Sequence, residues 1–371
     1  MAELYIGLMS GTSLDGVDGV LVAFEGEKIT VLAYSTAPFS KTLTQELMAL
    51  NSPGENELHR SALAANALVR VYAQVVENLL KKTGTARKQV LAIGAHGQTV
   101  RHQPQAFDGI GYTLQLNNPS LLAELVGIDV VADFRSRDVA AGGQGAPLVP
   151  AFHQALFGQA GSTVAVLNIG GISNITILGP DLADDVRGFD CGPGNVLMDA
   201  WCLRHQSQAY DELGAWAASG RVHPGLLAAL LSEPYFAQPA PKSTGRDLFN
   251  LSWLTKILLA FPDLIPADVQ ATLTELTARA CADCISNYEI DSEILIVCGG
   301  GAFNTYLMQR LQVFLPWLEV CSSQAHSLPP LQVEAAAFAW LARKTTRRET
   351  SSLQKVTGAK GARILGSICP A

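Results

Sequence analysis

The chain has 371 residues, 48% of them hydrophobic and 16% charged, with a formal net charge of −7. This length exceeds one ordinary core and predicts two domains, and the hydrophobic content argues against long disordered segments. An acidic chain without a basic stripe argues against a nucleic-acid-binding protein.

The N-terminus and the cysteines bear on the compartment. The opening residues, MAELYIGLM, lack the basic region, long apolar stretch and cleavage site of a signal peptide. Apolar runs elsewhere are too short to span a membrane. Seven cysteines, an odd number in a long chain, argue against a disulfide framework. We therefore expect a cytoplasmic protein with structural thiols and no membrane partner.

The first glycine-rich turn spans residues 10–16. Short apolar runs on either side of it predict a β-hairpin over residues 5–24. Its glycines have P-loop spacing, but Val17 stands where a P-loop has lysine, and a strand pattern follows where a P-loop has a helix. A glycine hairpin can still cradle phosphates through backbone N–H groups and the hydroxyls of Thr12 and Ser13. An ordinary polar turn is the alternative.

Two carboxylates flank that turn. Asp15 and Asp18 would repel a bare triphosphate. They are compatible with a phosphate site if a magnesium ion lies between them and the phosphates.

The segments between the glycine turns alternate between strand and helix patterns, which predicts an α/β fold. Strands are expected at residues 90–95 and 129–132, and helices at residues 42–50, 57–81, 120–126, 151–157, 195–204, 266–288 and 334–343.

Residues 96–101, HGQTVR, follow a predicted strand and resemble a binding loop. His96, Gln98 and Arg135 are residue types that often bind sugar hydroxyls, although each alone is more often a structural polar residue. The histidines have no zinc-ligand spacing.

The second turn, NIGGISN at residues 168–174, repeats the layout of the first. Residues 163–167 before it and 175–178 after it have strand patterns. A second hairpin at the start of the second half indicates an internal duplication and a second phosphate turn.

Asp190 lies in a glycine-rich segment, GFDCGPGN, at residues 188–195, just before a predicted helix. Asn195 is better placed than Asp190 to cap that helix. A carboxylate in this setting is suited to act as a general base, and an aspartate that stabilises a turn is the alternative.

The third turn, CGGG at residues 298–301, follows a buried strand pattern at 294–297. It precedes a predicted helix at 304–315, with Asn304 as N-cap. A nucleoside could pack against this backbone.

Eight motifs together resemble the anhydro-N-acetylmuramic acid kinase family, and the resemblance runs from residue 5 to the C-terminal segment. The motifs are MSGTSLDGVD (9–18), GAHGQT (94–99), ADFR (132–135), GGQGAPLVP (142–150), LNIGG (167–171), GFDCGPGN (188–195), PKSTGR (241–246) and VCGGG (297–301).

The resemblance implies two duplicated actin-like (ribonuclease H-like) domains with an interdomain nucleotide cleft, and a homodimer. We place domain I at residues 1–130 plus 345–371 and domain II at 131–344. The resemblance also implies ATP and 1,6-anhydro-N-acetylmuramic acid as substrates and magnesium as a cofactor, in cell-wall recycling. Two alternatives stay open: a kinase of another amino sugar with a free hydroxyl, and an ATP-gated binding protein of the same fold.

By position, the resemblance implies Asp190 as the catalytic base and Asp15 and Asp18 as magnesium ligands. Candidate sugar contacts are His96, Gln98, Arg135 and Glu334. Candidate nucleotide contacts are Gly11, Thr12, Ser13, Leu14, Asp15, Gly16, Val17, Asp18, Asn168, Gly170, Gly171, Gly299, Gly300, Gly301 and Asn304. In the wider superfamily an aspartate usually ends the first strand of each hairpin, whereas this chain has Met9 and Asn168 there.

Overall fold

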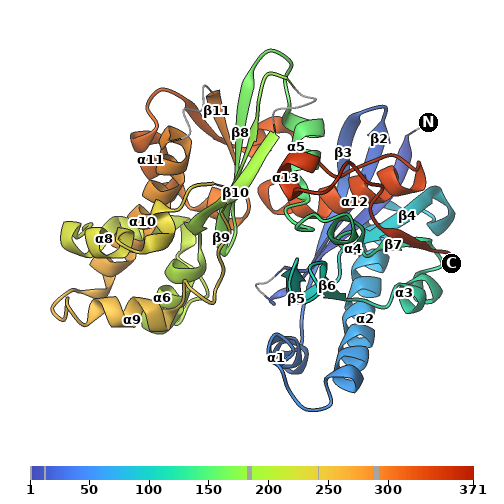
Figure 1. Ribbon diagram of the computed structural model, residues 1–371, viewed down its shortest axis with the longest axis horizontal. Coiled ribbons are helices and arrows are strands. Elements are labelled where there is room, and N and C mark those ends of the chain that lie inside the picture. The colour runs from blue at the N-terminus through green and yellow to red at the C-terminus, as the bar shows by residue number, and fades with distance from the viewer. Residues whose placement is uncertain (1, 12–13, 182–185, 241, 288–291) are drawn as a thin grey trace. The chain divides into compact units, whose positions relative to one another are not determined.

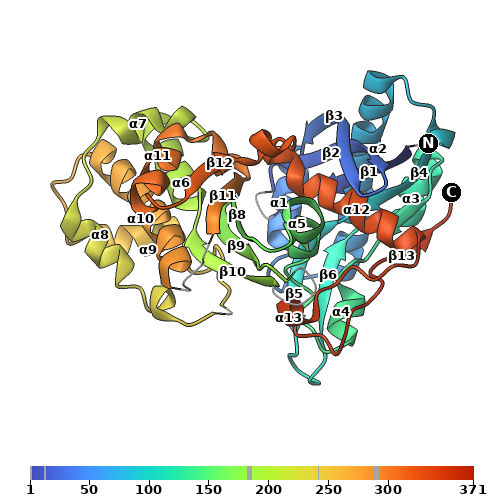
Figure 2. The same ribbon diagram turned by 90° about the horizontal axis from the view of Figure 1, so that it is seen from above.

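The computed structural model describes residues 2–11, 14–181, 186–240, 242–287 and 292–371. The chain divides into two compact units, which Figures 1 and 2 show as ribbons from two directions. Unit 1 is Met1–Leu156 with Gln332–Ala371, and unit 2 is Phe157–Leu331. Within the described ranges, no helix is both long and apolar enough to cross a membrane.

Unit 1 is built on a six-stranded sheet with the order β13-β7-β4-β1-β2-β3. Its strands are β1 (Glu3–Met9), β2 (Gly16–Glu25), β3 (Lys28–Pro38), β4 (Val90–Ala95), β7 (Val130–Ala132) and β13 (Ser367–Cys369), and β5 (Gln98–Pro104) and β6 (Gly111–Leu116) form a separate hairpin. Its helices are α1 (Lys41–Ala49), α2 (Glu57–Thr83), α3 (Pro119–Val126), α4 (Ser136–Ala140), α5 (Val149–Phe157), which ends at the boundary, α12 (Val333–Thr346) and α13 (Gln354–Thr357).

Unit 2 has a five-stranded sheet with the order β10-β9-β8-β11-β12. Its strands are β8 (Thr163–Ile169), β9 (Ile172–Leu178), β10 (Val186–Pro193), β11 (Ser292–Cys298) and β12 (Glu319–Ser322). Its helices are α6 (Val196–Gln206), α7 (Ala215–Ser219), α8 (Pro224–Leu231), α9 (Leu251–Leu258), α10 (Pro266–Asn287) and α11 (Thr305–Phe314).

The two sheets share one topology. In unit 1, β1, β2 and β3 are successively antiparallel, and β4 and then β7 add in parallel on the other side of β1. In unit 2, β8, β9 and β10 are antiparallel, and β11 and then β12 add in parallel beside β8. The order β3-β2-β1-β4-β7 therefore matches β10-β9-β8-β11-β12, which confirms the predicted duplication.

Helices α2 and α12 cover opposite faces of the unit 1 sheet. Alternate residues of a strand point to opposite faces, and Ile6 and Leu8 of β1 join α2 in a core cluster. Gly7 points the other way, where a Cβ atom would collide with the carbonyl oxygen of Ala335 in α12. Gly94 of β4 meets the carbonyl of Phe338 in the same manner. Both strands therefore approach the helix at backbone distance.

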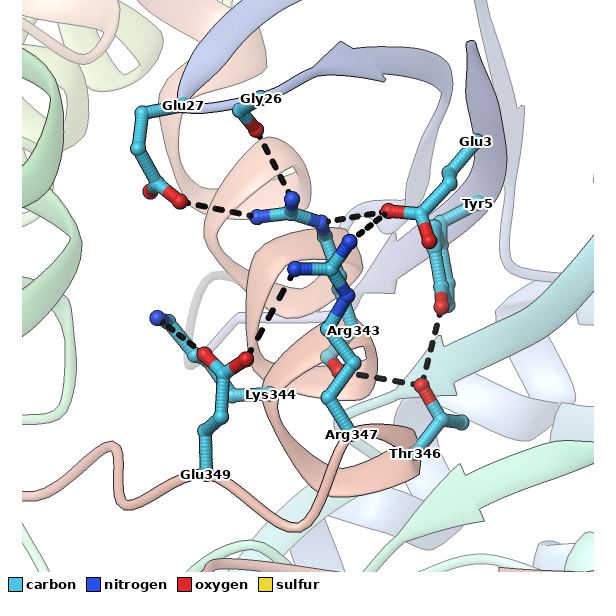
Figure 3. A network of polar contacts seen from close by, with 9 residues as sticks. All are labelled: Glu3, Tyr5, Gly26, Glu27, Arg343, Lys344, Thr346, Arg347 and Glu349. Carbon is cyan, nitrogen blue, oxygen red and sulfur yellow. Dashed lines mark hydrogen bonds and ion pairs between the residues drawn. The ribbon is translucent and has the colours of Figure 1, made fainter. Parts of the chain in front are cut away.

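Arg343 of α12 ties this helix to the first two strands (Figure 3). Its side chain is 1% exposed. Nε donates to Glu3 at 2.9 Å and Nη2 donates to the Gly26 carbonyl at 2.8 Å. Nη1 lies 3.7 Å from Glu27, and the guanidinium lies 4.9 Å from the centre of the Phe24 ring. The charge of this buried cation is therefore compensated by two carboxylates, a carbonyl and an aromatic ring, while Nη1 makes no hydrogen bond among the described residues.

The boundaries of the two units differ from the predicted domain boundaries. Those were placed between residues 130 and 131 and between residues 344 and 345. Unit 1 also holds residues 131–156 and 332–344. Helix α12 belongs there because it packs on β1 and β4. The segment after β7 belongs there because the Asp138 carboxylate accepts hydrogen bonds from the Thr357 hydroxyl at 2.8 Å and from the Gly145 N–H at 2.8 Å.

Two glycine-containing segments, the predicted binding loop at 96–101 and residues 188–193, lie largely in strands. Only His96 and Gly97 connect β4 to β5, and Gln98 already pairs with Leu116 of β6. Residues 188–193 lie in β10 rather than in a turn. In both cases pairing with a neighbouring strand overrides the turn preference of the glycines.

Replacing Arg343 with alanine is expected to lower the free energy of unfolding by about 3 kcal/mol. The change leaves a cavity and removes buried charge-assisted hydrogen bonds from Glu3 and Gly26. Urea unfolding of the full chain, followed by circular dichroism, measures the loss.

Arg347→Ala is the matched control. Arg347 bonds the same carboxylate at 2.7 Å, but its side chain is 38% exposed. Because exposed ion pairs contribute little, the expected loss is below about 1 kcal/mol. Equal losses in the two variants would contradict the structural role given to Arg343.

Candidate active-site residues

Asp190 lies at an irregularity in β10. It pairs with Asn174 of β9, and the register shifts between Asp190 and Gly192. Such a bulge redirects the side chains beside it. Gly192 has φ +148°, and a Cβ atom there would lie 2.8 Å from the Phe236 ring. The glycine therefore permits the bulge that sets the direction of Asp190.

A loop more than fifty residues later holds Asp190 in place. Its Oδ2 accepts hydrogen bonds from Ser243 Oγ at 2.9 Å and from the Thr244 N–H at 3.0 Å. Its own N–H donates to the Lys242 carbonyl at 3.0 Å, and its carbonyl accepts from the Tyr235 hydroxyl at 2.7 Å. Both the backbone and the carboxylate are therefore fixed.

Opposing effects set the pKa of Asp190. Burial raises it, and the hydrogen bonds from Thr244 and Ser243 lower it. The pKa stays above its ordinary value, because desolvation of the charged form outweighs the two donors. A fixed carboxylate with a raised pKa suits proton acceptance near neutral pH.

The second glycine turn joins β8 to β9 and is bonded to the start of α6. The N–H groups of Gly194 and Asn195 donate to the Gly171 and Gly170 carbonyls at 2.9 and 2.8 Å. Asn195 does not cap α6 with its side chain as predicted, because its Nδ2 donates to the Ile169 carbonyl at 3.2 Å instead. Asn168, also a predicted contact, is the penultimate residue of β8 and pairs with Asn174.

The third turn lies against the second. Gly299 has φ +77°, and a Cβ atom there would lie 2.5 Å from the Asn168 side-chain oxygen and 2.7 Å from the Ile169 carbonyl. Gly300 and Gly301 begin a short 3-10 helix after it. Asn304 caps α11 as predicted, with its side chain accepting from the Leu307 N–H at 2.9 Å. Unit 2 therefore brings both predicted nucleotide turns together.

Arg246 is a cation beside the second turn. The sequence pattern did not predict a role for it in the site. Its guanidinium would lie 3.3 Å from a Cβ atom on Gly171. It also acts on Asp199 of α6: burial raises the pKa of Asp199 to about 7, and the positive charge of Arg246 opposes that rise. An exposed guanidinium at a glycine turn is well suited to bind phosphate.

The first glycine turn, in unit 1, is held from β4 and β5. Ser10 Oγ donates to the Gly97 carbonyl at 3.1 Å, and Gln98 Nε2 donates to the Gly11 carbonyl at 3.0 Å. Thr12 and Ser13 lie outside the described residues. The side chains of Leu14 and Val17 are in the core, so only their backbones could face a ligand.

The predicted magnesium ligands Asp15 and Asp18 flank the start of β2. Asp15 is exposed, and Asp18 is half-buried and accepts a hydrogen bond from the Tyr34 hydroxyl. Burial raises the pKa of Asp18, Tyr34 opposes this, and the charge of Asp15 raises it further. No group of three potential ligand side chains occurs among the described residues. A carboxylate pair fits magnesium, which usually keeps waters and phosphate oxygens as further ligands.

The four predicted sugar contacts all belong to unit 1. Arg135 Nε donates to His96 Nε2 at 3.0 Å, and its Nη1 donates to the Gly145 carbonyl at 2.8 Å. Burial lowers the pKa of Arg135 to about 10, against the opposing charges of Glu334 and Asp138, so the guanidinium remains charged at neutral pH. Arg135 therefore contacts His96 directly and interacts electrostatically with Glu334.

His96 is neutral at physiological pH. Burial, reinforced by the charge of Arg135, lowers its pKa to about 3. Since Nε2 accepts from Arg135, the ring proton is on Nδ1. Gln98 is also buried, and its Oε1 has no hydrogen-bond partner among the described residues. Neutral polar groups of this kind suit the hydroxyl and amide groups of a sugar.

Ser243→Ala is expected to raise the pKa of Asp190 by about half a unit to one unit. The substitution removes a donor that favours the carboxylate, so protonation becomes easier. A ¹³C NMR titration of the Asp190 carboxyl group in the full chain measures the change. Thr244→Ala is the control, because it keeps the backbone N–H that bonds Asp190. An equal rise of the Asp190 pKa in both variants would contradict the role of the Ser243 hydroxyl as a stabilising donor.

Three comparisons place the chain among known proteins. The family model for anhydro-N-acetylmuramic acid kinase matches residues 3–371. Anhydro-N-acetylmuramic acid kinase of Albidiferax ferrireducens is 68% identical over all of both chains, and that of Variovorax paradoxus is 65% identical over 100% of this chain and 99% of its own.

Among solved structures, component A of (R)-2-hydroxyglutaryl-CoA dehydratase from Acidaminococcus fermentans superposes with a TM-score of 0.50. It is 10% identical and covers 91% of this chain and 96% of its own. At this identity the likeness concerns the fold alone, and it agrees with the duplicated actin-like α/β topology. From the whole-length match and the high identity of its relatives, the chain belongs to the anhydro-N-acetylmuramic acid kinase family.

Proposed function

We propose that the protein uses ATP and water to open the 1,6-anhydro bridge of 1,6-anhydro-N-acetylmuramic acid and to phosphorylate O6. The products are N-acetylmuramic acid 6-phosphate and ADP, in cell-wall recycling. The observation that carries this proposal is the fixed Asp190 carboxylate with its raised pKa. Membership of the family supplies the substrate class.

The substrate has no free hydroxyl at C6, so two events must be coupled. Asp190 accepts a proton from a water molecule whose oxygen bonds to C1. The C1–O6 bond breaks, O6 bonds to the γ-phosphorus, and the bond from that phosphorus to the β-phosphate bridging oxygen breaks. Ordinary glycoside cleavage needs a second carboxylic acid to protonate the leaving oxygen. Here phosphoryl transfer takes up the charge on O6, so one carboxylate suffices, and Asp190 returns its proton to solvent.

The glycine turns are proposed to bind the nucleotide through backbone N–H groups. In unit 2 these come from the turn at Gly170 and Gly171 and from the turn at 299–301, with Arg246 as an added cation. In unit 1 the turn from Gly11 to Gly16 serves the same purpose. Asp15 and Asp18 would hold magnesium, which when bound neutralises charge on the phosphates.

The sugar is proposed to contact His96, Gln98, Arg135 and Glu334. The charged guanidinium of Arg135 suits the lactyl carboxylate of the substrate, which a simple sugar lacks. The neutral His96 and the buried amide of Gln98 suit its uncharged groups. A magnesium requirement, a cytoplasmic location and a homodimer stay predictions.

Asp190→Asn is expected to lower kcat by about 100-fold or more, because asparagine cannot accept the proton of the attacking water. Steady-state kinetics with magnesium-ATP and the anhydro sugar measure the effect. Thermal unfolding checks that the variant is folded, and Asp199→Asn controls for loss of a carboxylate in the same unit. A folded Asp190→Asn enzyme with near-wild-type turnover would remove Asp190 from the mechanism.

Isotope incorporation distinguishes the coupled reaction from an ordinary kinase reaction. In ¹⁸O-labelled water, the product should carry one labelled oxygen at C1 and none in the transferred phosphate, as mass spectrometry of the two fragments can show. The label must be read before the anomeric hydroxyl exchanges with solvent.

A faster reaction with reducing N-acetylmuramic acid than with the anhydro sugar would favour a kinase of a free hydroxyl, and ATP binding without turnover of either sugar would favour a binding protein.

A further inference from the structure

Three arginines line a cavity of about 530 Å³ in unit 1. They come from three segments: Arg137 from α4, Arg348 from the end of α12, and Arg363 from the stretch before β13. The remaining lining residues are Thr345, Thr350, Ala362, Ile364, Gly366 and Ile368. The lining therefore combines three cations with two hydroxyl-bearing residues and includes no carboxylate.

Within the described part of the chain, none of the three arginines forms an ion pair with an acid. Among the described residues, their guanidiniums make one hydrogen bond, from Arg363 Nη1 to the carbonyl of Ala362. Glu349 is next to Arg348 in sequence, but its carboxylate binds Lys344 at 2.6 Å and lies near Arg347 (Figure 3). In a chain with a net charge of −7, three guanidiniums without a carboxylate partner among the residues that the structure describes therefore line one cavity.

The backbone of Arg348 is in a conformation that favours glycine. Its φ is +58°, in the left-handed region, and it directly follows Arg347, the C-cap residue of α12. Glycine is the common residue at this position of a helix, and a side chain there is strained. Residues held in such sparsely populated backbone conformations often lie at functional sites. Here the arginine side chain lines the cavity.

We propose that this cavity binds a small organic phosphate, namely the phosphomonoester of a sugar-sized molecule. One guanidinium group can bind two phosphate oxygens at once, and three guanidiniums together can neutralise the charge of a phosphate dianion. The volume lies in the range of pockets for small ligands and exceeds what inorganic phosphate needs. The side chains of Ile364 and Ile368 offer an apolar wall for the carbon skeleton.

Isothermal titration calorimetry of the full chain with glucose 6-phosphate tests the proposal. This probe is neither a substrate nor a product of the proposed reaction, so its binding is independent of that proposal. We expect saturable binding that weakens with added salt, weaker binding of inorganic phosphate and no binding of glucose. Absence of saturable glucose 6-phosphate binding would overturn the proposal, and inorganic phosphate binding equally well would overturn its organic part.

The triple variant R137Q/R348Q/R363Q is expected to weaken glucose 6-phosphate binding at least tenfold and to keep the kcat of the wild type. The matched control R70Q/R204Q/R221Q changes three other arginines and the net charge by the same amount, and it should bind as the wild type does. Equal weakening in both triple variants would mean that net charge, and not this cavity, is responsible.

Arg348→Gly separates binding from structure. Glycine relieves the left-handed strain, so Tm is expected to stay the same or rise while glucose 6-phosphate binding weakens. A structural role for Arg348 predicts the reverse, a lower Tm with unchanged binding. The single variant Arg363→Gln gives the same binding test if the triple variant does not fold.

Discussion

Close approach of one backbone to another is the constraint on which both units depend. Gly7 and Gly94 let α12 lie directly on β1 and β4, where any side chain would collide with the carbonyls of Ala335 and Phe338. Helix α12 also carries Glu334 in its first turn and Arg343 in its last. The glycines of two strands therefore set the position of a candidate sugar contact at one end of the helix and of the Glu3 ion pair at the other.

The same constraint shapes unit 2. A Cβ atom on Gly194 would collide with the Gly170 carbonyl, and one on Gly299 would lie 2.7 Å from the Ile169 carbonyl. The start of α6 therefore approaches the second turn at backbone distance, and so does the third turn. Backbone N–H groups near such turns can approach a phosphate closely, which side chains would prevent. In this unit the packing requirement and the proposed binding role need the same residues.

Local pattern was enough to predict much of this architecture but not its long-range contacts. The two hairpins and the helices α2 and α10 follow from glycine turns and hydrophobic periodicity, because both signals act over a few residues. Ser243 and Thr244 belong to the PKSTGR motif, yet their bonds to Asp190 span more than fifty residues and have no periodic signal. Asn195 had a good cap position, but the Ile169 carbonyl competes for its side chain. The boundary before α12 was missed because it depends on Gly7 and Gly94.

The arginines of this acidic chain divide by what their donors contact. Arg343 donates Nε to Glu3 and Nη2 to the Gly26 carbonyl and lies near Glu27, so its charge is compensated within the fold. Arg135 is intermediate, since His96 and Gly145 take Nε and Nη1. Arg246 lies exposed at a glycine turn. A buried guanidinium paired with carboxylates stabilises structure, whereas an exposed one with unused donors can bind an anion without breaking existing bonds. The proposed anion contacts therefore follow from the unused donors, because the net charge alone would repel phosphates.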